Sequence, residues 1–117
     1  MPQYMLLLYM PVEGGPTPDE AQAEYPKWMA YTESLREAGA FVAGDPLEGA
    51  DTATTVRVRS GETALTDGPY ADTKEALGGF YTIDVPDLDT ALGWAAKVPN
   101  VTYGSVEVRP VMSLPGM

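Results

Sequence analysis

The stretch Tyr4-Met5-Leu6-Leu7-Leu8-Tyr9-Met10 decides the fold of this chain. Almost every residue in it is apolar, whereas a strand with one solvated face alternates apolar and polar side chains. The segment therefore predicts a strand that is covered on both faces. Helices can cover one face, and a further surface must cover the other.

The rest of the sequence predicts two helices and several more strands. We expect Thr17 to cap the first helix, with Pro18 at its first position and Glu20 completing a capping box. Pro26 is expected to kink this helix or restart it. Asp87 is expected to cap the second helix. Further strands are predicted over residues 41–47, 54–59, 63–66, 79–85 and 105–111.

This order of elements predicts an α+β fold, a ferredoxin-like antiparallel sheet with two helices on one face. In the strand over residues 54–59, we expect Val56 and Val58 to face inward and Arg57 and Arg59 to face outward. The length of 117 residues fits a single domain over residues 1–117. Because strand 4–10 is apolar on both faces, the open face of the sheet is expected to pack against a second copy, giving a homodimer.

The composition excludes several classes of chemistry. The sequence contains no histidine and no cysteine, so thiol nucleophiles, Ser-His-Asp relays and His or Cys metal sites are impossible. Any general acid or base must be Asp, Glu, Lys or Tyr. The spacing of Asp84, Asp87 and Asp89 resembles a calcium site, but the glycine and the distant bidentate Glu of an EF-hand loop are missing. We expect no metal and no cofactor.

The charge balance restricts the partners. Seven basic and seventeen acidic residues give a formal net charge of −10, which repels phosphate backbones and anionic membrane surfaces. Nucleic-acid binding is therefore not expected. The apolar run from Met5 to Met10 is too short to span a bilayer, and no longer one follows. We expect a cytoplasmic protein that does not bind membranes.

The densest motif runs from Asp67 to Tyr81 and combines a turn, several charges and a glycine pair. Asp67 precedes Gly-Pro, where its carboxylate could act as a catalytic base or accept hydrogen bonds from turn amides. Lys74 lies between Asp72 and Glu75, where it could hold an anionic substrate or form a solvated ion pair. Gly78-Gly79 permits either a close approach of a ligand or a β-bulge.

Other candidate residues are expected around a pocket between the sheet and the two helices. Tyr9, Trp28 and Tyr81 could form aromatic walls with polar tips, although each also suits ordinary core packing. Asp45 in a Gly-Asp-Pro turn and Arg109 on the last strand are the remaining polar candidates for substrate binding. Arg109 could equally pair with Glu107 or with a neighbouring subunit.

Several segments together resemble a known family. They are Tyr4–Leu7, Ala43–Leu47, Thr54–Arg59, Asp67–Tyr81, Ile83–Asp89 and Gly104–Val111. They look like the YCII-related proteins, in the branch named for its Asp-Gly-Pro-Phe (DGPF) motif. Tyr70 stands where that branch usually has Phe.

The resemblance implies a dimeric α/β barrel, in which two ferredoxin-like sheets pack together, and it implies little about activity. Other YCII-related branches carry a His–Asp pair proposed as an active site, which this histidine-free chain cannot contain. A related domain occurs in a muconolactone dehalogenase. Relatives of the DGPF branch are often encoded near extracytoplasmic-function sigma factors.

Two classes of function stay open on the sequence. One is an isomerase, lyase or dehalogenase-like enzyme acting on a small anionic metabolite, with Asp67 as base and Lys74 or Arg109 holding the substrate. That interpretation predicts a closed polar pocket with a desolvated carboxylate. The other is a non-catalytic metabolite-binding or regulatory module that docks a partner such as a sigma factor. That interpretation predicts a shallow site or an exposed apolar surface.

Overall fold

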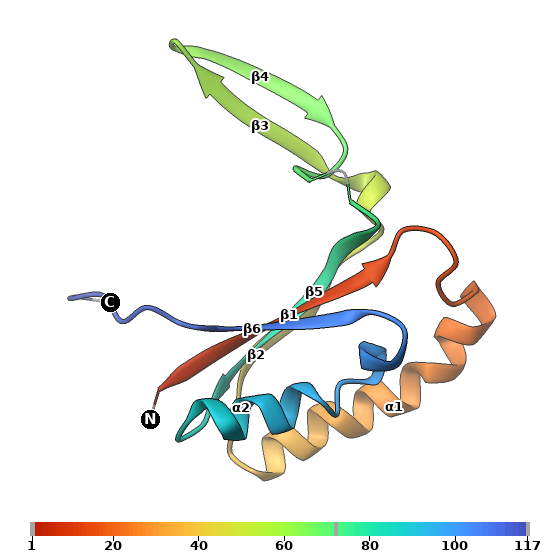
Figure 1. Cartoon of the computed structure of the whole chain (residues 1–117), viewed down its shortest axis with the longest axis vertical. Coiled ribbons are helices and arrows are strands. Elements are labelled where there is room, and N and C mark those ends of the chain that lie inside the picture. Colours follow the sequence, from red (N-terminus) through yellow and green to blue (C-terminus); the bar gives the residue numbers. More distant parts are fainter. Residues whose placement is uncertain (1, 72, 117) are drawn as a thin grey trace.

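The computed structural model describes residues 2–71 and 73–116, and within them it contains one four-stranded sheet, one two-stranded hairpin and two α-helices (Figure 1). The strands are β1 (Gln3–Pro11), β2 (Phe41–Pro46), β3 (Thr54–Arg59), β4 (Glu62–Asp67), β5 (Glu75–Asp84) and β6 (Ser105–Pro110). The helices are α1 (Pro18–Glu37) and α2 (Leu88–Ala95), with short 3₁₀ turns η1 (Ala50–Thr52) and η2 (Pro99–Thr102).

The sheet is antiparallel in the order β2-β5-β1-β6, and both helices lie on the same side of it (Figure 1). This arrangement confirms the predicted ferredoxin-like α+β fold. Helix α1 connects β1 to β2, and α2 connects β5 to β6. In each case one other strand lies between the two connected strands in the sheet, which is the arrangement of a ferredoxin-like fold.

β1 is a central strand whose two faces differ, as its sequence predicts. Leu6 and Leu8 are buried on the side of the helices, where they join the core with Leu35 and Ile83. Leu7 points to the other side of the sheet, directly opposite Phe80 on β5, and is only half-buried. The side of the sheet away from the helices, called here the open face, therefore carries apolar side chains that the described chain does not cover fully.

The first helix begins as the sequence predicts but does not break where expected. The Thr17 hydroxyl accepts a hydrogen bond from the Glu20 amide, and the Glu20 carboxylate accepts one from the Thr17 amide, so the capping box is present. The predicted restart at Pro26 is wrong, since α1 is one helix from Pro18 to Glu37. Pro26 is exposed, which leaves the helix carbonyl that lost its donor open to water.

The second helix is short and is anchored at both ends. The Asp87 carboxylate caps it by accepting hydrogen bonds from the amide and the hydroxyl of Thr90, as expected, and these bonds lower the pKa of Asp87. After α2, Asn100 in η2 is fully buried and donates its amide hydrogens to the carbonyl oxygens of Tyr9 and Ser105. No helix in the described chain is both long and apolar enough to span a membrane.

The predicted bulge at the glycine pair is confirmed. The pairing of β1 with β5 shifts between Leu8, opposite Gly79, and Tyr9, opposite Leu77, so Gly78 is the extra residue. A side chain at Gly78 would approach the Met10 side chain within 2.7 Å. The bulge changes the direction of β5 at the edge of the cleft described below.

The β3–β4 hairpin stands away from the rest of the molecule, and this contradicts the prediction for Val56 and Val58. Both valines are exposed, because β3 pairs with β4 and the two strands form a sheet of their own. Val56 and Val58 do share one face of the hairpin, but this face does not pack against the core of the described chain. The radius of gyration of 16.1 Å exceeds the roughly 13 Å expected of a compact chain near this length, as a projecting hairpin requires.

We predict that Gly104→Ala destabilises the fold and that Gly93→Ala does not. A Cβ at Gly104 would lie 2.2 Å from the Tyr9 carbonyl oxygen, so η2 or β1 must move, at a cost of about 1–3 kcal/mol. A Cβ at Gly93 on α2 meets nothing within 4 Å, and alanine there should raise the free energy of unfolding by about 0.5–1 kcal/mol. Urea unfolding followed by circular dichroism measures both, and equal stabilities of the two variants would contradict the packing described here.

Candidate ligand-binding cleft

A cleft of about 1340 Å³ opens between the sheet and α1. It is bounded by α1 as far as Arg36, by the end of β1 and the loop after it, by β2 with η1, by β5 as far as Tyr81, and by Tyr103. No residue of α2 lines it. The sequence prediction of a pocket between the sheet and both helices is therefore corrected, because α2 is short and packs toward β6 and β1 instead.

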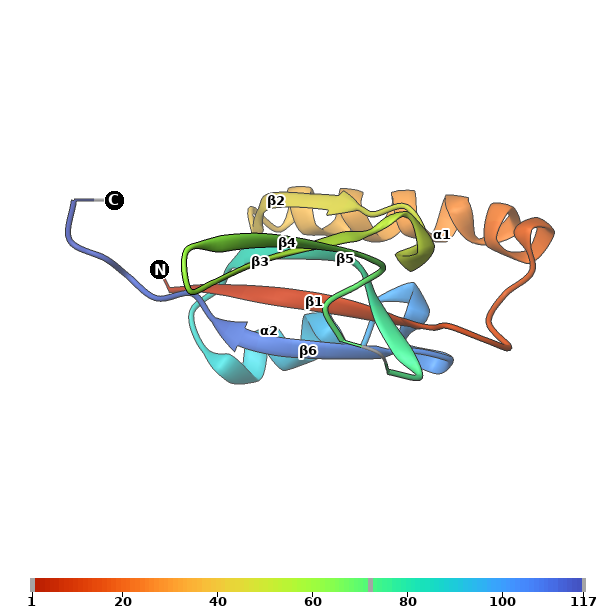
Figure 2. The same cartoon turned by 90° about the horizontal axis from the view of Figure 1, so that it is seen from above.

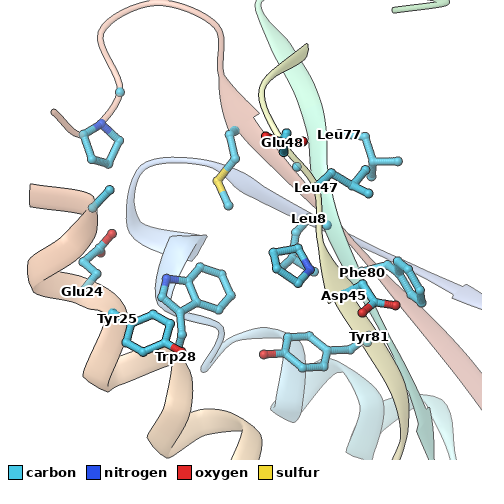
Figure 3. Close-up of a pocket in the computed structure, with 18 of the residues that line it drawn as sticks. Leu8, Glu24, Tyr25, Trp28, Asp45, Leu47, Glu48, Leu77, Phe80 and Tyr81 are labelled. Carbon is cyan, nitrogen blue, oxygen red and sulfur yellow. The ribbon is translucent and has the colours of Figure 1, made fainter. Parts of the chain in front are cut away.

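The walls of the cleft are largely aromatic. Trp28 and Tyr25 on α1 face Tyr81 on β5 across the opening (Figure 3). The Tyr81 hydroxyl lies 2.7 Å from the Thr32 hydroxyl, a hydrogen bond that joins the sheet to α1 at the base of the cleft. A Cβ at Gly44 would lie 2.7 Å from the Tyr81 ring, so glycine at that position leaves room for the ring beside β2. Trp28 and Tyr81 both line the cleft, and the alternative of core packing also applies, since Tyr81 is a buried core residue and Trp28 packs against the core.

Tyr103 and Glu24 connect η2 to α1 at the cleft wall. The Tyr103 hydroxyl donates to a Glu24 carboxylate oxygen at 2.8 Å. Burial disfavours the charged phenolate, and the neighbouring Glu24 carboxylate adds to this through its hydrogen bond and its charge, so the pKa of Tyr103 is raised to about 12. Tyr103 is thus a hydrogen-bond donor throughout the physiological range.

Acidic side chains outnumber basic ones around the cleft. Among the described residues that line it, the only basic side chain is Arg36, whose guanidinium carbon lies 4.7 Å from the centroid of the Phe41 ring. The acidic residues of the lining are Glu24, Glu33, Asp45, Glu48 and Asp51. The described residues contain no group of three acidic side chains arranged to hold a metal ion.

Asp45 lines the cleft but does not point into its aromatic part. It pairs with Phe80 across β2 and β5, while its neighbour Gly44 pairs with Tyr81, so Asp45 and Phe80 share the open face. Figure 3 agrees, with both side chains on the far side of the strands from Trp28. The cleft therefore continues around the edge of β2 from the helix side to the open face.

Tyr9 and Arg109 lie elsewhere, on the open face near β6. The Tyr9 hydroxyl donates to the Glu107 carboxylate at 3.1 Å, and Tyr9 neighbours Leu8 in a strand where Leu8 faces the helices. Partial burial, followed by the hydrogen bond and charge of Glu107, raises the pKa of Tyr9, while the charge of Arg109 opposes this rise. Tyr9, Glu107 and Arg109 form a polar group on the open face, separate from the cleft lining.

Asp67 and Lys74 are also outside the cleft lining. Asp67 is exposed at the end of β4, where its backbone pairs with Thr54. Lys74 is exposed just before β5, and its carbonyl oxygen accepts a hydrogen bond from the Val12 amide at 2.9 Å. The two residues stand at the base of the hairpin and at the start of β5, and Asp72 between them lies outside the described residues.

The central motif fixes the base of the hairpin. The Gly68 amide donates to the Ala53 carbonyl at 2.7 Å, and the Thr55 hydroxyl donates to the Gly68 carbonyl at 2.9 Å. Gly68 has a φ of 105°, a backbone conformation that side chains rarely permit. The Tyr70 ring lies 5.4 Å from the Arg57 guanidinium carbon. These contacts give the turn of the motif a structural role.

Sequence reasoning missed several residues of the cleft. Glu24 and Tyr25 lie four and three positions before Trp28, so helical spacing could have placed them on the same face of α1. Arg36 lies eight positions after Trp28 on the same helix, so spacing could have placed it there too. Tyr103 could not be found this way. Tyr103 reaches the cleft only because the buried Asn100 holds η2 against β1 and β6.

The chain belongs to the YCII-related domain family, which it matches over residues 3–115. Among curated relatives, an uncharacterized protein of Rhizobium meliloti (strain 1021), R00369, is 51% identical over 61 residues. That stretch covers 50% of this chain and 49% of the relative, so the match spans about half the length of each protein. The relative's name assigns no activity.

We predict that Tyr103 makes the fold sensitive to alkaline pH. Because its pKa is raised from 10.0 to about 12, its contribution to stability is complete below pH about 10 and is lost as the pH rises through about 12. Urea midpoints should show wild type more stable than Tyr103→Phe at pH about 9, with the difference shrinking toward pH about 12.

The matched variant for this measurement is Glu24→Gln, which removes the negative charge beside the phenol. It should lower the pH at which Tyr103 forms tyrosinate, read from ultraviolet absorbance. Parallel loss of stability in wild type and Tyr103→Phe across this range would contradict the assignment.

Proposed function

We propose that this YCII-related protein is a small-molecule-binding module whose ligand lies in the cleft between α1 and the edge of the sheet. The aromatic walls formed by Tyr25, Trp28 and Tyr81 are the observation that carries the proposal. Ligand sites combine mainly apolar and aromatic walls with a few polar groups. Here the polar groups are the Tyr81–Thr32 and Tyr103–Glu24 pairs.

The ligand we propose is largely apolar and carries no net negative charge. The acidic lining with Arg36 as its basic side chain favours a neutral or cationic molecule, since a carboxylate or phosphate would meet repulsion. Aromatic faces add a further attraction for cations. An anionic metabolite held by Lys74 has less support, because Lys74 is not part of the lining.

An isomerase, lyase or dehalogenase-like activity is the second candidate. Asp67 as base has little support from the geometry, since it is exposed at the foot of the hairpin. The open shape of the cleft and the exposed position of Asp45 and Glu48 favour binding over chemistry that needs a desolvated carboxylate. We therefore propose binding without catalysis.

Membership of the DGPF branch, a cytoplasmic location and a regulatory role are parts of the same proposal. The branch is supported by Asp67-Gly68-Pro69 followed by the aromatic Tyr70. The location is supported by the absence of cysteine. A sigma factor as partner rests on the resemblance to the DGPF branch alone, and it is compatible with a binding module that reports on a metabolite.

The ligand proposal is tested with three probes that share one ring system: tryptamine, indole-3-ethanol and indole-3-acetate, which are cationic, neutral and anionic. Isothermal titration calorimetry and thermal shift should rank the cation and the alcohol above the carboxylate. A ligand at one hundred times its dissociation constant adds about 2.7 kcal/mol, or several degrees of melting temperature.

The control variants are two exposed tyrosines changed in the same way. Tyr25 is 62% exposed and lines the cleft, whereas Tyr70 is 78% exposed and does not. Tyr25→Ala should weaken binding and Tyr70→Ala should not. Tightest binding of indole-3-acetate would overturn the charge argument, and equal effects of the two variants would overturn the location of the site.

We also propose that the protein is a homodimer joined through the open face of the sheet. Met5, Leu7 and Phe80 are half-buried there, on strands β1 and β5. Apolar side chains gathered on one face of a sheet are characteristic of an interface. Two such faces can pack with twofold symmetry, each contributing the same residues.

We predict that Leu7→Asp converts the dimer into a monomer and that Leu92→Asp leaves it intact. Leu7 lies on the open face, and Leu92 is exposed on α2, on the opposite side of the molecule. Burial of an unpaired carboxylate in an interface is strongly unfavourable. Light scattering after size exclusion gives the mass, and circular dichroism verifies that both variants are folded. A wild-type mass of 12.5 kDa at all concentrations would contradict the dimer.

A further inference from the structure

The β3–β4 hairpin, called here the arm, has an apolar face without cover. Val56 and Leu65 lie directly opposite each other, with Val58 two residues along, and all three share one face. Their side chains are 60%, 69% and 55% exposed, respectively. All six residues of β4 are exposed.

Such an arm is not expected to hold its shape in water by its own contacts. A two-stranded hairpin is marginally stable alone, and each of its strands presents an unpaired edge. The contacts that fix it are at its base, where Gly68 bonds to Ala53 and Thr55. The outer part, which carries Val58 and Thr63, needs a surface that lies beyond the base.

The position of the arm indicates where that surface comes from. The arm leaves the sheet between β2 and β5 and leans over the open face, on the side opposite the helices (Figure 1). The view from above agrees, since the arm crosses over the strands of the sheet (Figure 2). A second copy seated on the open face would lie between the sheet and the arm.

Charge favours the same occupant. The formal charges of Arg57 and Arg59 are balanced by those of Glu62 and Asp67, so the arm is neutral, although the whole chain carries −10. The neutral arm is thus a part of this acidic chain that can approach a second acidic copy without net repulsion. Twofold symmetry closes the arrangement, because each copy lays its arm on the other.

We infer that the arm clasps the second copy of the chain, so that the apolar face of Val56, Val58 and Leu65 is buried in the partner subunit. This inference rests on the proposed homodimer and goes beyond it. The open face supplies the shared core of the dimer, and the arms hold the two copies from outside. The arm lies in sequence between η1 and β5, and residues of both elements line the cleft, so the clasp also restrains this end of the cleft.

The experiment measures the dimer dissociation constant and the rate of subunit exchange. The chain has no cysteine, so Ala23→Cys on the exposed side of α1 gives one labelling site for donor and acceptor dyes. The test variant is Val56→Ser with Leu65→Ser, which makes the apolar face of the arm polar. The matched control is Ala64→Ser, on the opposite face of β4.

We expect the double variant to raise the dissociation constant at least roughly tenfold and to speed subunit exchange, while Ala64→Ser behaves like wild type. Circular dichroism of both variants, recorded at concentrations where each is still dimeric, should match wild type, because the arm is outside the core. A wild-type dimer whose dissociation constant is equal in both variants would overturn the clasp and leave the open-face dimer standing.

Two further outcomes separate the clasp from the dimer proposal. A dimer loosened by the arm variant but not by Leu7→Asp would support the clasp and remove the open face from the interface. A wild-type chain that is monomeric at every concentration would overturn both and make the arm a docking surface for a different protein.

Discussion

The pairing of β1 on both of its edges is the constraint on which the rest of the structure depends. β1 bonds to β5 on one side and to β6 on the other, so it cannot move without breaking the whole sheet. Leu6 and Leu8 bring it into the core beneath the helices. Asn100 adds a further tie, since its amide bonds to the β1 carbonyl of Tyr9 from within η2. Burial and hydrogen bonding thus hold the same strand.

The cleft is a consequence of where the helices stop covering the sheet. The short α2 packs toward β1 and β6, while α1 extends past the end of β2. Aromatic rings line the cleft between α1 and the strand ends. The hydrogen bond between the hydroxyls of Tyr81 and Thr32 links its two walls at the base. The sheet edge and one long helix therefore form the two main walls of this concave surface, and the loops after β1 and β2 complete it.

The same fold leaves two apolar surfaces on the side away from the helices, the open face and the arm. In one chain these surfaces do not bury each other, and exposing apolar side chains to water is unfavourable. A second copy would bury both surfaces at once. The proposed assembly, the proposed clasp and the continuation of the cleft around β2 are therefore three aspects of one region of the molecule.

The sequence by itself determined the fold and the starts of its helices, because these depend on local signals. The apolar run of β1, the capping box at Thr17 and the cap at Asp87 act within a few residues, so they can be recognised without a partner segment. The bulge at Gly78 was also predicted from a local signal, the glycine pair. Family membership was predicted from segments along the whole sequence. Spacing places Trp28 and Tyr81 on the covered faces of their elements, and it is the same for a core residue as for a pocket wall.

Only the tertiary structure shows which candidate site residues lie close to one another. Alternation along β3 predicts an inward face for Val56, but only the path of the chain shows that no core of the described residues covers it. Asp67 and Lys74 belong to the densest motif, yet they stand at the foot of the arm, and Tyr103 joins Glu24 from a distant turn. Distances between segments depend on how the sheet and helices pack in three dimensions, and periodicity within one segment carries no information about them.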